Sequence, residues 1–240
     1  MSRKEFFLAL LNWFYPHRCA VCAAGLPMEK PEEHLCVPCF SSVASVEGFV
    51  CMCCGLPLPD GGMHCWSCKK TKWSFTYVRS FASYQDPIKS LILRLKYQEK
   101  KFLALDLAHF LNAAWKKYPE LHAAQSIVPV PLHPLSERER GYNQSLLLAQ
   151  EFVKGVDGLQ LLPDVLQRVR ATQTQTRLSR EARLENMEDA FIVRDPQAVH
   201  GKNILLIDDV CTTGATLNAC AKALKKSGAK NIFGLTLARD

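Results

Sequence analysis

One stretch limits the folds open to this chain more than any other. A hydrophobic run, Ile204–Ile207, follows the turn residues 200–203 and predicts a buried strand of a parallel sheet. The strand is expected to end at Asp208 and Asp209, before a Thr/Gly loop and a helical pattern over 217–227. A strand, a loop and a helix in this order direct free backbone N–H groups toward an anion, usually a phosphate. We therefore predict an α/β fold with an anion site at the end of this strand.

The residues of the loop indicate which anion. A nucleotide-hydrolysing P-loop needs a Lys in the turn, and this turn has none. It offers hydroxyl donors and a glycine instead, and its residues are Thr212, Thr213, Gly214, Ala215 and Thr216. Two carboxylates directly before a phosphate cradle repel the phosphate unless another group lies between them. The 2′- and 3′-hydroxyls of a ribose fit that place, and a divalent cation bridging a pyrophosphate would offset the remaining charge.

This stretch resembles the signature with which type I phosphoribosyltransferases bind phosphoribosyl pyrophosphate (PRPP). The resemblance covers the hydrophobic strand, Asp208-Asp209 and the pattern Thr-Thr-Gly-x-Thr. The plainer alternative is a strand end whose Asp residues only cap the next helix.

Cysteines give the second strong signal. Eleven stand in the 240 residues, and eight of them form Cys-x-x-Cys pairs. The pairs are Cys19/Cys22, Cys36/Cys39, Cys51/Cys54 and Cys65/Cys68. This spacing predicts two structural Zn²⁺ ions held by four thiolates each, and hence a reducing, cytoplasmic compartment. We favour sequential sites, with the first two pairs on one zinc, although a cross-braced arrangement has the same spacing. Cys53 exceeds the pattern, and His34 and His64 are interpreted as neighbours of ligands.

The cysteines also divide the chain. Residues 1–72 are predicted to form an N-terminal double zinc-ribbon module, and residues 73–240 a phosphoribosyltransferase-like domain. No apolar run approaches the roughly 20 residues that span a bilayer. Residues 1–15 are interpreted as a short helix packing on the zinc module, and peripheral membrane contact through their aromatic side chains is the alternative.

The rest of the chain alternates between strand and helix patterns. Strands are predicted at 75–84, 126–131, 190–193, 204–207 and 231–237, and further helices from residue 87, over 102–118 and over 145–154. This alternation predicts a mostly parallel sheet flanked by helices.

Positive charge gathers in two segments, 94–101 and 165–183. The candidate nucleic-acid contacts are Lys96, Lys100, Lys101, Arg168, Arg170, Arg177 and Arg183. Residues 166–186 are interpreted as a mobile loop that closes over a phosphate-rich ligand or holds a nucleic-acid backbone. A solvated surface is the plainer alternative for both segments.

A further segment, Val128–Pro131, leads into Arg138-x-Arg140-Gly141-Tyr142-Asn143-Gln144. Together with the cysteine pairs and the acidic loop, it resembles the ComF family of competence proteins over nearly the whole chain. That family more often has Phe at the position of Tyr142. The resemblance implies a double zinc ribbon joined to a type I phosphoribosyltransferase domain. It also implies that Arg138, Arg140 and Gly141 line a pyrophosphate loop and that Asp208 or Asp209 acts as a catalytic base.

The resemblance further implies a role in natural transformation. It suggests handling of incoming single-stranded DNA at the inner face of the membrane, beside helicase-like and other DNA-processing competence proteins. Two hypotheses follow. The chain is an enzyme that transfers phosphoribose from PRPP to an acceptor nitrogen, in nucleotide salvage or elsewhere, with Mg²⁺ stabilising the departing pyrophosphate. Alternatively, it handles DNA and its PRPP site is regulatory or vestigial. No segment of the sequence indicates an acceptor.

Overall fold

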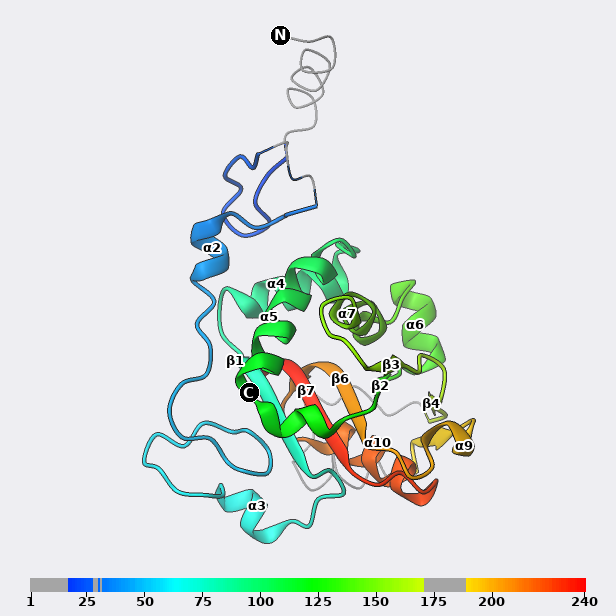
Figure 1. Ribbon diagram of the computed structural model, residues 1–240. Coiled ribbons are helices and arrows are strands. Elements are labelled where there is room, and N and C mark those ends of the chain that lie inside the picture. The colour runs from blue at the N-terminus through cyan, green and yellow to red at the C-terminus, as the bar shows by residue number, and fades with distance from the viewer. Residues whose placement is uncertain (1–16, 28–29, 31, 171–188) are drawn as a thin grey trace.

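The computed structural model describes residues 17–27, 30, 32–170 and 189–240 (Figure 1). The interpretations of residues 1–15, and of residues 171–186 within the second basic segment, lie outside the described residues. The core is a sheet in which all neighbouring strands are parallel, in the order β1-β7-β6-β2-β3. Its strands are β1 (Tyr77–Ser83), β2 (Ser126–Pro129), β3 (Gln160–Leu161), β6 (Ile204–Cys211) and β7 (Ile232–Arg239). The predicted parallel sheet is confirmed.

Helices cover both faces of the sheet (Figure 1). One face packs against α4 (Ile88–Tyr97), α5 (Leu103–Lys117) and α7 (Gln144–Val153), and the other against α10 (Ala215–Lys226) and the hairpin of β4 (Leu166–Arg168) and β5 (Phe191–Val193). The short helices are α2 (Val37–Ser41), α3 (Trp66–Lys70), η1 (Pro119–Ala123), α6 (Pro134–Arg140) and α9 (Pro196–Val199). A hydrophobic core lies on each face of the sheet, and successive residues of β6 belong alternately to the two cores. Because both faces are buried, the sequence of this strand is a continuous apolar run.

The end of β6 differs from the prediction. The strand does not stop at the acids but continues through both of them to Cys211. The reason is that β7 keeps pairing beyond the apolar run, with Asp208 opposite Thr236 and Cys211 opposite Arg239. Both acids therefore lie within the strand and not beyond its end.

Among the elements that were not predicted from the sequence, two occupy segments that were interpreted as loops. Helix α6 occupies part of the segment after β2 that was interpreted as a loop, and the His133 side chain caps it by accepting from the backbone N–H of Leu135. Strand β4 forms the first three residues of the segment 166–186, which was interpreted as a mobile loop. Leu166 is buried there, and β4 pairs antiparallel with β5, so tertiary packing outweighs the polar composition that surrounds it.

The first zinc ribbon, the segment that carries Cys19, Cys22, Cys36 and Cys39, lies against helix α5. The backbone N–H of His34 donates to Asp106 at 3.0 Å, and the His34 ring nitrogen Nδ1 lies 3.1 Å from the other oxygen of the same carboxylate. The ring of Phe40 stacks on Phe110 at 4.6 Å.

The second zinc ribbon, the segment that carries Cys51, Cys54, Cys65 and Cys68, lies beside the edge strand β1. The backbone N–H of Val78 donates to the carbonyl of Cys53 at 2.7 Å. Gly55 has a φ of +69°, and a Cβ there would stand 2.6 Å from the Val78 oxygen. Only glycine therefore fits this contact between the ribbon and the strand.

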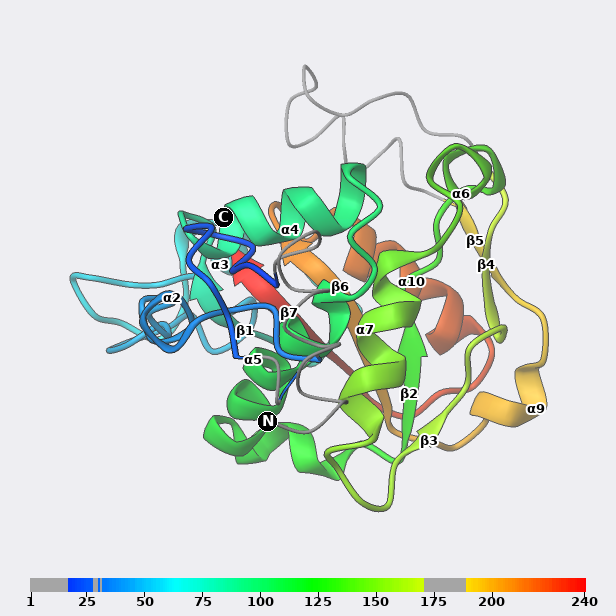
Figure 2. The same ribbon diagram turned by 90° about the horizontal axis from the view of Figure 1, so that it is seen from above.

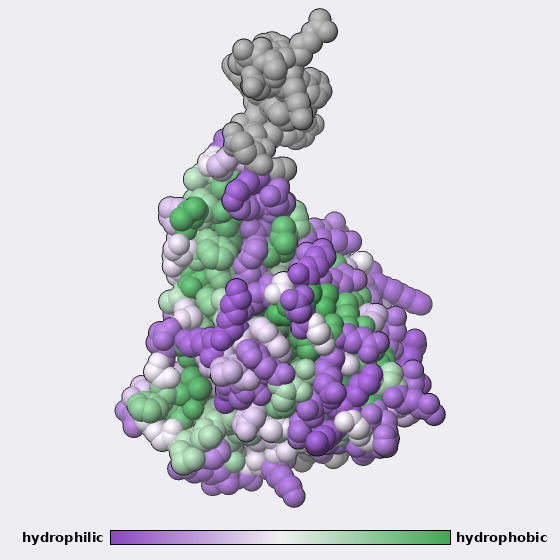
Figure 3. Space-filling view, viewed as in Figure 1, coloured by the Kyte–Doolittle hydropathy of each residue, from purple (hydrophilic) through white to green (hydrophobic). Residues whose placement is uncertain are grey.

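Much of the apolar surface lies on the ribbons. Figure 3 shows hydrophobic residues gathered along the edge that the ribbon segments form, and Val37, Phe49, Met63 and Trp66 are each well exposed. A module with so many apolar side chains outside has little core of its own, so bound metal must supply much of its stability. No helix in the described part of the chain is both long enough and apolar enough to span a bilayer.

Candidate functional site

Eight thiols meet in two groups of four. The sulfurs of each group lie within 4.8 Å of one another, and Cys22 and Cys36 are separated by 3.6 Å, Cys54 and Cys65 by 3.7 Å. Tetrahedral zinc with Zn–S bonds of about 2.3 Å requires S···S separations of about 3.8 Å, so both groups fit Zn²⁺. The groups are Cys19, Cys22, Cys36 and Cys39, and Cys51, Cys54, Cys65 and Cys68.

The grouping decides between the two arrangements left open by the spacing. Each site takes two consecutive pairs, so the sequential arrangement is confirmed. Neither His34 nor His64 joins a group, as predicted, and Cys53 stands outside both. Four thiolates leave no open coordination position, which favours a structural role for both metal sites.

Donors around the sulfurs support metal binding. The backbone N–H of Cys36 lies 3.4 Å from the Cys19 sulfur, and the indole N–H of Trp73 lies 3.2 Å from the Cys68 sulfur. Hydrogen bonds of this kind stabilise thiolate ligands and orient them toward the metal.

Asp208 is buried at the carboxyl end of β6. Its Oδ1 accepts from the Ser145 hydroxyl at 2.8 Å and from the backbone N–H of Asp209 at 3.0 Å. Burial, followed by the neighbouring charge of Asp209, raises the pKa of Asp208 to about 7. A carboxyl with this pKa exchanges a proton near neutral pH, which suits general acid–base chemistry.

Asp209 is bound by a lysine from helix α4. The Lys96 ammonium lies 2.7 Å from Asp209 Oδ1, with 19% of the lysine side chain and 4% of the aspartate side chain exposed. Burial disfavours the charged lysine, but the adjacent Asp209 carboxylate outweighs burial and raises the pKa of Lys96. The second oxygen of Asp209 is buried and has no hydrogen-bond partner among the described residues. An unused buried acceptor of this kind fits a hydroxyl donor such as that of a ribose.

The Thr/Gly loop lies directly beyond the acids. Gly214 has a φ of +80° and forms the N-terminal cap of α10, so the backbone turns sharply into the helix. The Thr213 hydroxyl accepts from the backbone N–H of Ala215 at 3.3 Å. A small cavity is lined by Asp208, Thr212, Gly214, Ala215 and Thr216, together with three neighbouring residues. The structure thus brings one predicted acid and the predicted phosphate loop together.

The predicted pyrophosphate residues belong to α6 and its end. Arg138 is exposed, whereas Arg140 is half-buried, donates to the Gln144 side chain and lies 5.3 Å above the ring of Tyr97. Gly141 ends the helix. Figure 2 shows α4 and α6 over the same end of the sheet.

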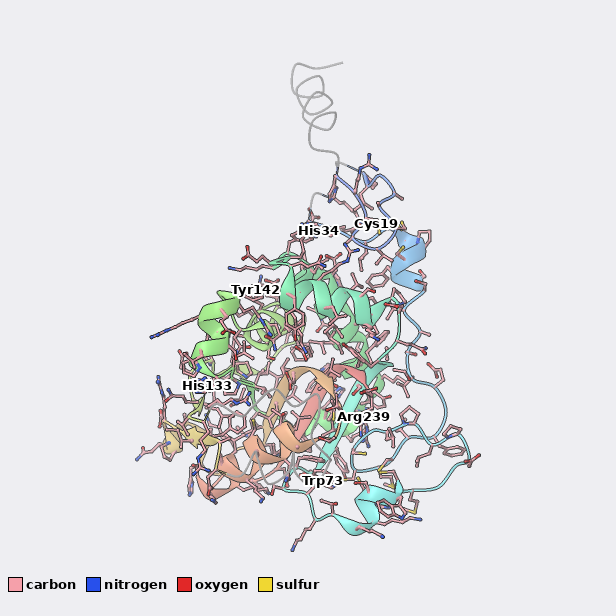
Figure 4. The ribbon with its side chains drawn as sticks, turned by 180° about the vertical axis from the view of Figure 1, so that it is seen from behind. Cys19, His34, Trp73, His133, Tyr142 and Arg239 are labelled. Carbon is pink, nitrogen blue, oxygen red and sulfur yellow. The ribbon has the colours of Figure 1, made fainter. Side chains whose placement is uncertain are left out.

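Between α4 and α6 lies a pocket of about 340 Å³. It is lined by Lys96, Tyr97, Glu99, Ser136, Glu139, Arg140 and Tyr142. Lys96 belongs both to this pocket and to the ion pair with Asp209, so the pocket adjoins the acidic site. Figure 4 shows Tyr142 beside α4, on the α6 side of the molecule.

The basic candidates are found in different places. Lys100, Lys101 and Arg170 are exposed, and the Lys101 ammonium lies 4.8 Å above the Tyr142 ring. Arg168 is half-buried in β4, where burial lowers the pKa of its guanidinium.

Three other basic candidates need separate mention. Arg177 and Arg183 lie outside the described residues. Lys96 was predicted as a nucleic-acid contact, but its ammonium is bonded to Asp209 in the acidic site.

The sequence analysis did not assign Lys96 or Ser145 to the acidic site, where they bind Asp209 and Asp208. Ile88, Ile92 and Lys96 are spaced four residues apart and share one face of α4, whose apolar members are buried. A lysine on an apolar helix face indicates a buried anion nearby, so the periodicity contained the signal. Ser145 had none, because its partner Asp208 is 63 positions away in the sequence.

Comparisons with known proteins agree with this architecture. One family model, described as a double zinc ribbon domain, matches residues 10–69, and a second, described as a phosphoribosyl transferase domain, matches residues 144–239. Competence protein F of Haemophilus influenzae is 33% identical over 230 residues, which cover 94% of this chain and 98% of that protein. DNA utilization protein YhgH of Escherichia coli O157:H7 is 30% identical over 220 residues, covering 90% and 94%. Competence protein ComFC of Bacillus subtilis is 29% identical over 220 residues, covering 88% and 86%.

Proposed function

Because the chain belongs to the ComF family of competence proteins, we propose that it binds PRPP at the carboxyl end of β6 and handles single-stranded DNA in natural transformation. The observation that carries the PRPP site is the unpartnered, buried oxygen of Asp209 at the strand end that leads into the glycine-capped loop before α10. Anion-binding amides and a hydroxyl acceptor at one strand end match the two ends of a ribose 5-phosphate.

Each part of PRPP has a counterpart in the site. The ribose hydroxyls would donate to Asp209 and Asp208, and the 5-phosphate would accept from the amides and hydroxyls of residues 212–216. Arg140 and the exposed Arg138 would contact the pyrophosphate through their guanidinium groups. Mg²⁺, when bound, would offset the charge of the pyrophosphate. Lys96 then has to share Asp209 with the ribose or move away from it.

Transfer of phosphoribose is the finer part of the proposal. Asp208 is about half protonated near neutral pH, given its pKa of about 7, and can take up a proton from an acceptor nitrogen. The pocket between α4 and α6 offers aromatic side chains at its edge. The alternative is a phosphoribosyltransferase of nucleotide salvage or metabolism that has no direct DNA role.

The experiment that tests the site is calorimetric titration of the zinc-loaded protein with PRPP and Mg²⁺. We expect Asp208→Asn with Asp209→Asn to weaken binding by about 100-fold or more, because two charge-assisted hydrogen bonds are lost. The matched control is Asp157→Asn with Asp164→Asn, which removes the same charge from exposed loops. Equal affinity in the two double variants would refute the site.

A second measurement separates the two functions. Pyrophosphate release from PRPP would be followed with and without single-stranded DNA. Release that requires both DNA and the acids supports an enzyme whose activator or acceptor is nucleic acid. Pyrophosphate release at the same rate with and without DNA supports the metabolic alternative. Tight PRPP binding without release supports a DNA-handling protein that senses PRPP.

A further inference from the structure

We propose that the second zinc ribbon positions the phosphate loop through Arg239 and Trp73, and that PRPP affinity therefore depends on this ribbon. The inference rests on the PRPP site proposed above for its ligand. The two residues connect the loop to different zinc ligands of the same metal site.

Arg239, the last residue of β7, is buried and joins the ribbon to the loop. Its Nε donates to the carbonyl of Cys54 at 3.2 Å, and its Nη2 lies 3.8 Å from the Cys54 sulfur. The remaining nitrogen, Nη1, donates to the carbonyl of Cys211 at 2.7 Å and to that of Thr212. One planar guanidinium thus holds a zinc ligand on one edge and the start of the phosphate loop on the other.

Trp73 makes a second connection. Its indole N–H lies 3.2 Å from the sulfur of Cys68, and its ring lies next to Gly214, where a Cβ would stand 3.6 Å from two ring carbons. The next residue, Ser74, donates its backbone N–H to the Asn218 side chain of α10 at 2.8 Å. The segment that leaves the second ribbon therefore packs on both the loop and the helix that follows it.

Charge explains why the metal matters to these contacts. Four thiolates around one Zn²⁺ leave a net charge of roughly −2, which favours a buried guanidinium beside them. Without the metal the ribbon loses its fold and both anchors lose their partners. The first ribbon contacts α5 instead, and Figure 4 shows Cys19 at the opposite end of the molecule from Trp73, with Arg239 between them and nearer to Trp73.

Arg79 provides a matched control. It is as buried as Arg239, and its Nη1 lies 3.5 Å from the carbonyl of Cys51 in the same ribbon. Its other hydrogen bonds go to the Val78 carbonyl and Glu120, and its guanidinium lies over the rings of Tyr77 and Tyr118, so it reaches the ribbon through groups that are not part of the loop. Lysine at either position keeps the charge but loses the planar fork that spans two partners.

The test is hydrogen exchange of the full-length, zinc-loaded chain without ligand, read on peptides that cover residues 209–217. We expect Arg239→Lys to raise amide exchange there about tenfold, and to raise the Kd for PRPP by a similar factor. Arg79→Lys, and Asp106→Asn at the first ribbon, should leave both quantities within about twofold of wild type. Zinc content is measured in parallel and should stay at two ions per chain in Arg239→Lys.

A second pair of variants tests the same inference in case Arg239→Lys does not fold. Trp73→Phe removes the donor to Cys68 but keeps a ring, and Trp66→Phe is its exposed control in the same ribbon. Faster loop exchange in Trp73→Phe alone supports the inference. Equal exchange within both matched pairs overturns it. Wild-type protein that fails to bind PRPP would refute the proposed function, while the exchange comparison would still decide whether the ribbon positions the loop.

Discussion

At the scale of single residues, Asp208 links folding to pH. Its pKa is raised from 3.8 to about 7 by burial and by Asp209, so the folded chain keeps a proton that the unfolded chain releases over this interval. The stability that this proton provides is fully present below about pH 4 and is lost as the pH rises through about 7. Asp208→Asn should therefore gain stability relative to wild type as pH rises.

Denaturant unfolding of the zinc-loaded proteins at pH 6 and pH 8 measures this gain. The advantage of Asp208→Asn should grow by about 1 kcal/mol between these two values. Asp164→Asn, on an exposed turn, serves as the control. A constant difference between wild type and Asp208→Asn would contradict the raised pKa.

The ion pair of Lys96 and Asp209 gives a second residue-scale prediction. Lys96→Met leaves a buried carboxylate without its counter-charge and should cost about 3 kcal/mol of unfolding free energy. Adding Asp209→Asn removes the stranded charge and should recover more than half of the loss, which a double-mutant cycle by urea unfolding would show. Lys89→Met, on the exposed face of α4, is the control. Additive losses would mean that the pair is not coupled.

The sequence was most informative about residues that act through local spacing. The four cysteine pairs were predicted, because Cys-x-x-Cys brings two ligands together within one turn. Their sequential grouping was only favoured, since a cross-braced arrangement has the same spacing. The acids of β6 and the Thr/Gly loop were predicted to bind a ribose phosphate from local spacing as well, and that assignment stays a prediction. Ser145 reaches Asp208 across the fold, through packing that spacing does not encode. For Lys96 the helix periodicity held the signal of a buried anion, but not the identity of its partner Asp209.

At the scale of elements, the contact between the second ribbon and β1 depends on one glycine. Gly55→Ala places a Cβ against the Val78 oxygen and adds strain at positive φ, so it should cost about 2–4 kcal/mol. Gly48 has a similar φ of +75° but open space around its Cα, and Gly48→Ala should cost only about 1 kcal/mol. Competition with a chelator would then remove zinc from Gly55→Ala first. Equal zinc retention would show that the ribbon folds independently of β1.

Elements were predicted well where periodicity is strong. The amphipathic pattern of α4 and the apolar runs of β2 and β6 were assigned correctly, but the end of β6 was not, because β7 extends the pairing past the acids. Helix α6 is short and has no buried residue, so its sequence has no apolar face to detect. Strand β4 has three residues and pairs with β5, which lies more than twenty positions away in the sequence.

At the scale of the whole molecule, charge distribution leads to a prediction about DNA. Lys100, Lys101 and Arg170 are exposed, and Lys101 lies over Tyr142, which lines the pocket next to the acids. Changing all three to Gln should weaken binding of single-stranded DNA. It should also lower the slope of log K against log salt by about 2, since each neutralised phosphate contact contributes about 0.7.

The matched control removes three charges from the other end of the sheet. Lys202, Lys225 and Lys230 are close to the amino ends of β6 and β7 and to the end of α10. Their change to Gln should leave the salt slope as in wild type. A slope that falls equally in both triple variants would place the DNA surface elsewhere.

The pairing of β1 with β7 has a consequence for the order of events during synthesis. Ser80 and Thr236, which meet across these strands, are 156 positions apart. The cysteines of the second ribbon span only Cys51 to Cys68, so this ribbon can bind zinc soon after it leaves the ribosome. Strand β1 and Trp73 must then wait for the remainder of the sheet, and the phosphate loop gains its last anchor only when Arg239 has been added. The last anchor of the proposed ligand site is therefore synthesised long after the four cysteines of the second ribbon.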